Sequence, residues 1–312
     1  MISLDDIRAA RLRIAPYVRR TPVMPLEALK NQRFSGQVIV KLECLQVTGS
    51  FKARGAMNAY LSAAPGAASA GLVTASGGNH GLAVARTAHV AGLPATIFLP
   101  STVPASKIEK LKLWGARTHV IGDVWDASNA AALAFAEQTG ALYLHPFAHA
   151  PVVAGQGTVA LELLEQIPDA GAVVIAIGGG GLIAGMAAAL KALKPGIRII
   201  GVEPEGSPTL HASLAAGHVV TLDKVTTRVS TMACRRTDDA LFALSQPLID
   251  EVILVSDDAM QEAARWLWFE MGISADLSGA ASIAALFSGR IRPDGNAPLA
   301  ALICGAGPEG TL

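Results

Sequence analysis

The stretch Ser50-Phe51-Lys52-Ala53-Arg54-Gly55-Ala56 places one lysine where a predicted strand gives way to a predicted helix. A β-rich run over residues 38–42 precedes it, and Gly49-Ser50 are expected to supply the turn and the cap of a helix that continues to Leu61. Lys52 would then lie in the first turn, where the helix dipole and burial both disfavour an ammonium. Such an amine can attack a carbonyl. The alternative is that this lysine and the neighbouring arginine are ordinary solvated charges.

Short apolar runs alternate with helical patterns along the rest of the chain. This alternation is typical of βαβ units and predicts an α/β fold whose mostly parallel sheets are flanked by helices. Strands are expected at residues 38–42, 71–74, 96–99, 118–121, 172–177, 199–202 and 299–303. Helices are expected at residues 4–18, 50–61, 81–91, 105–114, 126–139, 153–166, 182–193, 209–216, 257–271 and 280–287.

Two irregular stretches divide this pattern into two lobes. Pro65-Gly66 is a breaker after the Lys52 helix, and the segment from Tyr143 to Pro151 has the character of a crossing back to the first lobe. We therefore expect a large domain formed by residues 1–65 plus 149–312 and a small domain formed by residues 66–148, with a cleft between them.

The composition excludes several classes of protein. Of the 312 residues, 51% are hydrophobic and 16% are charged, so the chain can bury a large core. The formal net charge is zero, which gives no electrostatic basis for binding nucleic acid or an anionic membrane. The uncharged run from Ala170 to Leu190 is long enough to cross a bilayer, but its four central glycines favour a buried strand, a turn and a helix. No membrane span is expected, and the expected partners are small molecules and copies of the chain.

The cysteine pattern bears on the compartment. Cys44, Cys234 and Cys304 lie far apart and show neither a disulfide framework nor the spacing of a zinc site. The N-terminal segment mixes acidic and basic residues and lacks the apolar core of a signal peptide. We therefore expect a cytoplasmic protein.

Three further loops each follow a predicted strand, and ligands of open parallel sheets bind beyond the carboxyl ends of strands. Ser76-Gly77-Gly78-Asn79-His80-Gly81 opens a helix whose free N–H groups can grip a carboxylate. Gly178 to Gly181 lets a phosphate approach several N–H groups. Cys304-Gly305-Ala306-Gly307 ends the last strand, where a thiol can meet a ring nitrogen. Taken singly, the loops also have ordinary explanations: a helix cap by Ser76 or Asn79, tight glycine packing, and a core cysteine.

Taken together, five loops resemble one family in order and spacing: SFKARG, SGGNHG, AGQGT at residues 154–158, GGGGL at residues 178–182, and the cysteine-glycine end of the last strand. They resemble the serine/threonine dehydratase branch of the fold-type II pyridoxal-phosphate (PLP) enzymes, within the tryptophan synthase beta-like superfamily. The resemblance covers nearly the whole chain and implies the two-lobed architecture of that fold. A dinucleotide-binding interpretation explains the glycines but leaves Lys52 without a task, and no GxGxxG opens a helix after the first strand.

The resemblance implies a role for each motif. Lys52 would hold the aldehyde of pyridoxal 5'-phosphate as an internal aldimine and then serve as the catalytic base at the substrate Cα. Phe51 would pack beside the ring, Asn79 would bind the ring hydroxyl, and Cys304 would face the ring nitrogen. The implied cofactor ligands are Phe51, Lys52, Asn79, Gly178, Gly179, Gly180, Gly181, Leu182 and Cys304. The implied substrate ligands, which receive the carboxylate, are Ser76, Gly77, Gly78, Asn79 and His80.

The implied reaction is the dehydration and deamination of a β-hydroxy amino acid such as L-threonine or L-serine to a 2-oxo acid and ammonia. A thiol does not hold a full proton on the ring nitrogen as an aspartate would, which favours expulsion of a β-leaving group over transamination. Gly77 stands where related racemases carry a serine as second base, and His80 stands where related synthases usually carry threonine. Racemisation is therefore expected to be weak or absent, and a dehydratase is favoured over a synthase. The family also implies a homodimer.

The preferred substrate stays open. No lysine or arginine occurs from Thr118 to Leu190, which favours a neutral substrate over hydroxyaspartate, although Arg235 and Arg236 are candidate partners for a second carboxylate. Gly307 replaces the family's usual asparagine, and Asp276-Leu277 replace a Glu-Pro pair. The alternatives are a dehydratase for hydroxyaspartate or another 3-substituted serine, an amino acid racemase, and a non-catalytic PLP-binding protein.

The resemblance leaves a cation site open. Glu203-Pro204 match the glutamate of a cation site in several relatives, but Thr209 replaces the acidic residue expected a few positions later. Glu203 is therefore the one candidate ligand, and whether a monovalent or divalent cation binds is left open. With no added domain in the sequence, control by a regulatory module that responds to amino acids is not expected.

Overall fold

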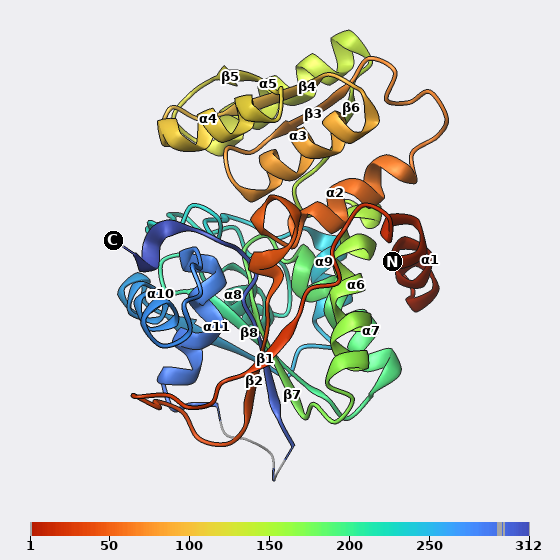
Figure 1. Cartoon of the computed structure of the whole chain (residues 1–312). Helices are drawn as coiled ribbons and strands as arrows, with labels where there is room; N and C mark the ends of the chain where they lie inside the picture. Colours follow the sequence, from red (N-terminus) through yellow and green to blue (C-terminus); the bar gives the residue numbers. More distant parts are fainter. Residues whose placement is uncertain (1, 292–294, 296, 312) are drawn as a thin grey trace.

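The computed structural model describes residues 2–291, 295 and 297–311 and shows two α/β lobes (Figure 1). The α/β class predicted from the alternation of strands and helices is confirmed. The helices are α1 (Leu4–Ile14), α2 (Lys52–Leu61), α3 (Asn79–Ala91), α4 (Ala105–Leu113), α5 (Trp125–Thr139), α6 (Ala150–Gln166), α7 (Gly181–Leu193), α8 (Thr209–Ala216), α9 (Asp239–Ser245), α10 (Asp257–Met271) and α11 (Leu277–Phe287). The strands are β1 (Val23–Pro25), β2 (Val38–Lys41), β3 (Leu72–Ala75), β4 (Ala95–Leu99), β5 (Arg117–Val120), β6 (Leu142–Tyr143), β7 (Ala172–Ala176), β8 (Arg198–Pro204), β9 (Glu251–Val255) and β10 (Leu299–Leu302). The short 3₁₀ helices are η1 (Glu43–Leu45), η2 (Val47–Gly49) and η3 (Pro308–Gly310).

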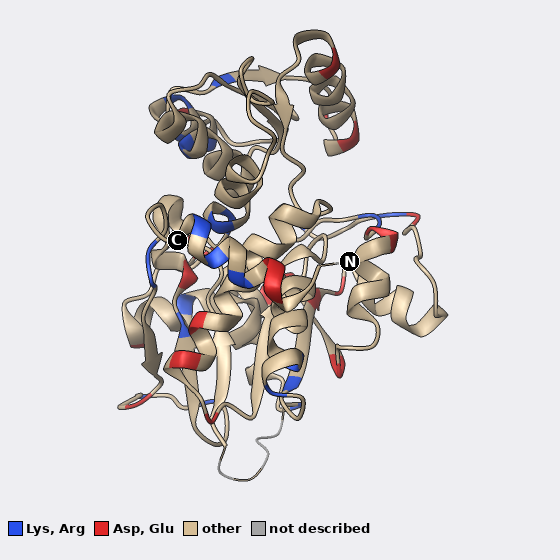
Figure 2. Cartoon of the chain, turned by 90° about the vertical axis from the view of Figure 1, so that its right-hand side faces the viewer, with Lys and Arg blue, Asp and Glu red and all other residues tan. Residues whose placement is uncertain are grey.

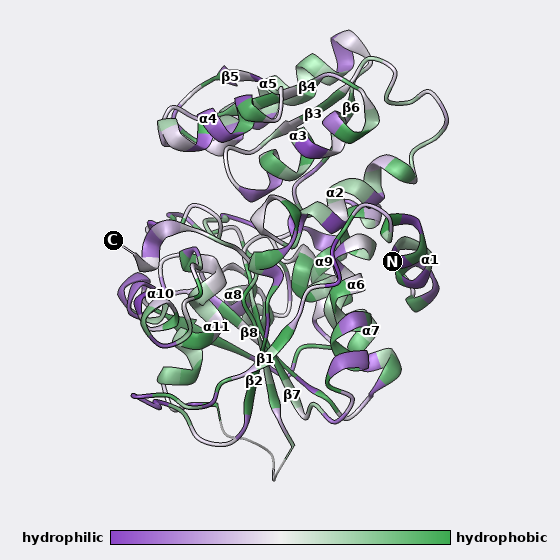
Figure 3. Ribbon diagram, in the orientation of Figure 1, coloured by the Kyte–Doolittle hydropathy of each residue, from purple (hydrophilic) through white to green (hydrophobic). Residues whose placement is uncertain are grey.

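The larger sheet has the strand order β1-β2-β10-β7-β8-β9. Its neighbouring strands run parallel except β1 and β2, which are antiparallel. Strands β7 and β10 are buried along their whole length, and Figure 3 shows apolar residues concentrated on the strands. Helices α6 and α7 lie on one side of this sheet and α10 and α11 on the other (Figure 1). Covering both faces with helices explains why the strands are continuous apolar runs.

The smaller sheet has the order β5-β4-β3-β6 and is parallel throughout. Its strands all lie within residues 66–148, the segment expected to form the small domain, whose exact boundaries stay a prediction. The chain enters this lobe after α2 and returns to the large lobe before α6 (Figure 1). The small lobe is therefore an insertion with two chain crossings.

Glycines inside α2, α6 and α7 let these helices approach one another closely. A Cβ on Gly155 in α6 would lie 2.7 Å from the carbonyl oxygen of Arg54 in α2. On the α7 side, a Cβ on Gly185 would lie 2.9 Å from the backbone nitrogen of Gly157. The AGQGT motif therefore lies inside α6 and serves helix packing, so its placement among the loops was wrong.

Several element boundaries differ from the prediction for local reasons. Two 3₁₀ helices separate β2 from α2, whose N-cap is Phe51 without a side-chain capping bond, so the expected cap by Ser50 is wrong. Helix α6 begins at Ala150, three residues early, because Pro151 in the first turn removes no helical hydrogen bond. Helix α11 begins at Leu277 because the Asp276 side chain accepts the N–H of Gly279 and caps it.

Four elements are absent from the prediction: β1, β6, α9 and β9. Strands β1 and β6 have three and two residues, too few for a periodic pattern. Helix α9 has only seven residues and is capped by Asp238. Helix α1 ends at Ile14, earlier than expected, because Pro16 cannot continue it.

The distribution of charged and apolar residues bears on possible binding to nucleic acid or membranes. Figure 2 shows acidic and basic residues on both lobes instead of one patch of a single sign. Within the part of the chain that the structure describes, no helix is long and apolar enough to cross a bilayer. The uncharged run from Ala170 to Leu190 forms β7, the glycine turn and most of α7.

Candidate active site

Lys52 is the first residue of α2 and faces the second chain crossing. Its Nζ donates a hydrogen bond to the carbonyl oxygen of Pro146 at 2.6 Å. Burial lowers the pKa of Lys52 to about 8, and the nearby Cys304 and Cys234 thiols act in the opposite direction. The amine therefore has a larger neutral, nucleophilic fraction near neutral pH than an ordinary lysine, in the direction that the sequence predicts.

The arginine two residues later is buried, so the alternative of a solvated charge is wrong for it. Arg54 donates Nε to Oε2 of Glu43 at 2.8 Å and Nη2 to Oε1 of the same residue at 2.7 Å. Its Nη2 also bonds Glu162 in α6, which lies 3.5 Å from the Nζ of Lys41 in β2. This neutral set of two cations and two carboxylates ties α2 to the sheet and to α6, and so fixes the backbone that carries Lys52.

The end of β10 lies beside the start of α2. The N–H of Phe51 bonds the carbonyl oxygen of Cys304 at 3.2 Å, and Ser50 pairs with Gly305. Phe51 and Cys304 are both buried, with the Cys304 Sγ 3.9 Å from the Oγ of Ser278. Burial raises the pKa of Cys304, so the side chain is a neutral thiol at neutral pH. The structure thus brings together two motifs 250 residues apart in the sequence.

The glycine loop joins β7 to α7. Gly180 is the N-cap of α7 at φ 91°, a conformation that glycine adopts without strain, and makes no side-chain capping bond. A Cβ on Gly179 would lie 2.6 Å from Cδ2 of Phe147, and one on Gly178 would lie 2.9 Å from the carbonyl oxygen of Thr231. These contacts explain why Gly178 and Gly179 carry no side chain, while α7 still presents its first N–H groups without a side-chain partner among the described residues.

The Ser76-to-Gly81 loop joins β3 to α3. Gly78 is the N-cap of α3 and makes no side-chain capping bond, so neither Ser76 nor Asn79 caps the helix. A Cβ on Gly77 would overlap the Val103 side chain, 2.7 Å from Cγ1. The loop's N–H groups at the helix start are therefore available to an anion, as the carboxylate-binding prediction requires.

His80 is buried in the first turn of α3. Its Nε2 lies 3.0 Å from the carbonyl oxygen of Leu144, so Nε2 carries the proton. Its Nδ1 has no hydrogen-bond partner among the described residues. Burial lowers the pKa of His80 to about 3, and Lys52 lowers it further. The imidazole is neutral, with one buried acceptor nitrogen near the lysine.

Asn79 connects the two lobes. Its Nδ2 donates to Oδ2 of Asp276 at 2.8 Å, while Oδ1 of Asp276 accepts the N–H of Gly279 at 2.6 Å. The sequence marks Asp276 only as a departure from the family pattern and gives no sign of this contact. Local patterns do not show it because the two residues are 197 positions apart.

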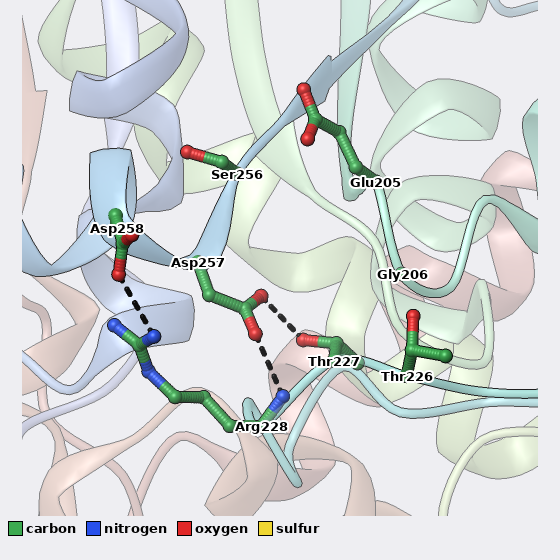
Figure 4. Close-up of a pocket in the computed structure, with 8 residues that line it drawn as sticks. All are labelled: Glu205, Gly206, Thr226, Thr227, Arg228, Ser256, Asp257 and Asp258. Atoms are coloured by element: carbon green, nitrogen blue, oxygen red, sulfur yellow. Dashed lines mark hydrogen bonds and ion pairs between the residues drawn. The ribbon is translucent and has the colours of Figure 1, made fainter.

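The segment from Thr221 to Thr237 borders the glycine loop and is held by hydrogen bonds to the start of α10. Asp257 at the start of α10 accepts hydrogen bonds from Thr227 Oγ1 at 2.6 Å and from the following backbone N–H at 2.7 Å (Figure 4). Farther along, Thr231 presses its carbonyl oxygen against Gly178. This segment is therefore held in place beside the glycine loop rather than being a free loop.

Glu203, the candidate cation ligand, accepts two backbone hydrogen bonds. Its Oε1 accepts the N–H of Leu210 and its Oε2 accepts the N–H of His211, each at 2.8 Å. Both oxygens are thus used at the start of α8. Within the described residues, no group of three or more His, Cys, Asp or Glu side chains is arranged to hold a metal ion. The geometry favours a capping role for Glu203 over the cation site that the sequence left open.

The second chain crossing supplies site residues that the sequence missed. Pro146 accepts from Lys52, and Phe147 packs on the glycine loop. The residues His145-Pro146-Phe147 carry no glycine motif, and the only available signal was a crossing segment that returns to the first lobe. Their position depends on how the two lobes meet.

Comparisons with known proteins agree with this geometry. The family model described as pyridoxal-phosphate dependent enzyme matches residues 14–305. The L-threonine ammonia-lyase of Thermotoga maritima is 36% identical over 92% of this chain and 72% of that protein. A serine racemase of Oryza sativa subsp. indica is 38% identical over 91% of this chain and 84% of that protein. The structure of maize serine racemase superposes with a TM-score of 0.92 at 35% identity, over 97% of this chain and 93% of that one.

These matches confirm the family, the enzyme class and the cofactor expected from the sequence, while the roles of individual residues stay predictions. The loops after β7 and β10 follow the carboxyl ends of neighbouring strands of the larger sheet, and the loop after β3 follows the carboxyl end of a strand of the smaller sheet. The chain belongs to the pyridoxal-phosphate dependent enzyme family, in the serine/threonine dehydratase branch of its fold-type II members.

Proposed function

We propose that this chain is an ammonia-lyase that dehydrates a neutral β-hydroxy amino acid, L-threonine or L-serine, to a 2-oxo acid and ammonia. The cofactor supplies the electron sink that makes the Cα proton of a bound amino acid acidic. The Cα–H and Cβ–O bonds break, water leaves, and hydrolysis of the resulting enamine consumes one water and releases ammonia. A cytoplasmic homodimer with the domain division given above is part of this proposal.

The residues present fit pyridoxal phosphate. Gly178 to Gly181 lead into the start of α7, whose first N–H groups have no side-chain capping bond, and Leu182 continues this cradle into the helix. In this proposal the cradle binds the phosphate, Phe51 packs beside the ring, and the Cys304 thiol faces the ring nitrogen. Asn79 binds the ring hydroxyl. Its amide nitrogen has two hydrogens, so it can serve that group and Asp276 together.

Lys52 both binds the cofactor and moves the proton. Its lowered pKa suits an amine that is neutral when it takes the Cα proton. The Pro146 carbonyl oxygen, 2.6 Å from Nζ, holds the ammonium that results. The loop from Ser76 to His80 binds the substrate carboxylate through backbone N–H groups at the start of α3.

The packing of Gly77 is the observation that supports dehydration rather than racemisation as the activity. A racemase needs a second base on the opposite face of the substrate, and related racemases carry a serine at this position. Here Val103 fills the space in which that side chain would lie. The chain therefore supplies a base on one face, which suffices for elimination.

The placement of the two candidate arginines supports a neutral substrate. Arg235 and Arg236 are exposed. Arg235 Nε donates to the carbonyl oxygen of Leu222, and Arg236 bonds Thr221 and Asp239. Both guanidinium groups are thus engaged on the outside of the segment. A substrate with a second carboxylate would have no cation within residues 118–190 to pair with.

The test is a visible spectrum and a product assay on the purified protein. With added pyridoxal phosphate, the wild type should show the band of the lysine-bound cofactor, and Lys52→Ala should lack it. A 2-oxo acid assay on serine, threonine, 3-hydroxyaspartate and 3-phenylserine should give product from one of the first two. A band without any product would instead support a non-catalytic PLP-binding protein, and product from hydroxyaspartate alone would overturn the substrate proposal.

Racemisation is the second candidate because serine racemases are as similar to this chain as the lyases are. It predicts that substrate recovered from deuterium oxide carries deuterium at Cα and has inverted configuration. The lyase proposal predicts 2-oxo acid without inverted substrate. Chiral chromatography of the recovered amino acid distinguishes the two.

A further inference from the structure

His145 shapes the second chain crossing through one ring nitrogen. Its Nδ1 accepts the backbone N–H of Phe147 at 3.2 Å and that of Ala148 at 2.8 Å. These donors lie two and three residues after it, which is the pattern by which Asn and Asp side chains stabilise Asx turns. Because Nδ1 accepts, the proton of the neutral ring is on Nε2.

The turn built in this way places two contacts at the site. Pro146, inside the turn, directs its carbonyl oxygen to the Lys52 amine at 2.6 Å. Phe147, the next residue, lays its ring on the glycine loop, where a Cβ on Gly179 would lie 2.6 Å from Cδ2. The two residues that follow His145 therefore touch the amine and the predicted phosphate cradle, one each.

The surroundings keep the ring neutral and in place. Its centroid lies 4.7 Å from that of Phe147, edge to face, and 6.2 Å from that of Trp125. Burial lowers the pKa of His145 to about 4, the charge of Lys52 lowers it further, and Asp238 acts in the opposite direction. A ring protonated on both nitrogens could not accept the two N–H groups, so the turn requires the neutral form.

We propose that His145 is a positioning residue for Lys52: through Nδ1 it builds the turn that presents the Pro146 carbonyl oxygen to the amine. This inference rests on the proposed role of Lys52. The carbonyl fixes the direction of Nζ and stabilises its protonated form. Loss of the turn removes that acceptor, so it changes both the orientation of the amine and its affinity for a proton.

Two substitutions separate the turn acceptor from the imidazole. His145→Asn keeps an acceptor atom bonded to Cγ, at the place of Nδ1, and can form a true Asx turn. His145→Gln moves the acceptor one bond farther away and cannot. Each full-length variant is assayed for turnover with cofactor. Without cofactor, the pKa of Lys52 is measured from the pH dependence of its acetylation by acetic anhydride, followed by mass spectrometry.

We expect His145→Asn to retain wild-type turnover and Lys52 pKa. His145→Gln should lose about 10-fold to 100-fold in kcat, and its Lys52 pKa should fall by about one unit, the effect of one lost hydrogen bond to a charged group. Equal behaviour of the two variants, or a loss confined to His145→Asn, would overturn the proposal. If His145→Gln does not fold, His145→Asn decides alone, because any role of the imidazole other than the turn predicts that it fails. If the wild type shows no turnover, the proposed function is contradicted. The Lys52 pKa of the variants, measured without cofactor, still tests the role of His145 in that case.

Discussion

Asp276 accepts a hydrogen bond from Asn79 at 2.8 Å and thereby joins the first turn of the small lobe's α3 to the large lobe's α11. A carboxylate only accepts, so this contact fixes the orientation of the Asn79 amide, with nitrogen toward Asp276. The same carboxylate caps α11 through the N–H of Gly279. The Asp276 side chain therefore both caps the start of α11 and orients Asn79, a predicted cofactor ligand.

Asp276→Asn should weaken cofactor binding with little effect on stability. The amide keeps an oxygen for the Gly279 N–H but places its own donor opposite the Asn79 donor. We expect the Kd for pyridoxal phosphate to rise about 10-fold, equal to about 1.4 kcal/mol. Asp276→Ala, as control, also loses the cap and should lower the unfolding free energy by about 1 kcal/mol. Absorbance titration and urea unfolding measure the two effects; an unchanged Kd in Asp276→Asn would contradict the role given to this contact.

Gly77→Ser should be poorly tolerated unless Val103 is shortened. The new side chain overlaps Val103 Cγ atoms, and overpacking of this kind costs about 1–3 kcal/mol of stability. In Gly77→Ser combined with Val103→Ala the space is open. The double variant should regain stability and exchange the Cα proton of serine with inversion. Thermal unfolding and chiral analysis in deuterium oxide provide the measurements, and a fully stable single variant would count against the packing argument.

Glu203 should make stability depend on pH. Burial raises the pKa of Glu203 from 4.5 to about 7 in the folded protein. Between these values the folded state binds more protons than the unfolded state, so this group's contribution is fully present below pH 4.5 and is lost as the pH rises through about 7. Glu203→Gln has no such titration, and its amide nitrogen would face one of the two N–H groups at the start of α8. We expect the variant to be less stable by about 1–3 kcal/mol at low pH, with the difference shrinking toward neutral pH.

Urea unfolding of wild type and Glu203→Gln across the range from pH 4.5 to 7 tests this pH dependence. A difference that stays constant or grows with pH would show that the folded-state carboxyl does not titrate in this range.

Gly155→Ala should separate helix packing from helix propensity. Alanine favours an isolated helix over glycine by about 1 kcal/mol, but here its Cβ would lie 2.7 Å from the Arg54 carbonyl oxygen. We expect a net loss of about 1–3 kcal/mol in the unfolding free energy. Gly196→Ala, in the turn between α7 and β8, controls for the added methyl group alone, because a Cβ there meets no atom within 4 Å. Urea unfolding of both variants gives the comparison, and equal stabilities would refute close packing of α2 on α6.

The alternation of strands and helices was predictable because it depends on local patterns. Runs such as Ala172–Ala176 and Leu299–Leu302 are buried and apolar throughout, and the glycine turn after β7 is a local signal too. The short β1 and β6 were not predictable, since their pairing partners rather than their composition define them. The motif order also identified the family, which the comparisons confirm.

Contacts between residues far apart in the sequence could not be predicted from it. The Ser76–Gly81 and Gly178–Gly181 loops could be recognised as binding loops from their own residues. The contacts of Asn79 with Asp276 and of Lys52 with Pro146 join residues 197 and 94 positions apart, and no local pattern encodes them. Packing also gave some glycines a second explanation: Gly77 and Gly155 face neighbouring side chains or backbone instead of a ligand.

The two crossings between the lobes lie against each other. The amine of Lys52 bonds Pro146, and the amide of Asn58 donates to the carbonyl oxygen of Pro151 at 2.7 Å, so α2 and the start of α6 form a paired hinge. A rotation of the small lobe about such a double tether has its axis close to Lys52. In such a rotation the parts of the small lobe far from the axis would move most, while the reactive nitrogen would stay nearly stationary. The enzyme can admit and release small molecules without displacing the atom that performs the chemistry.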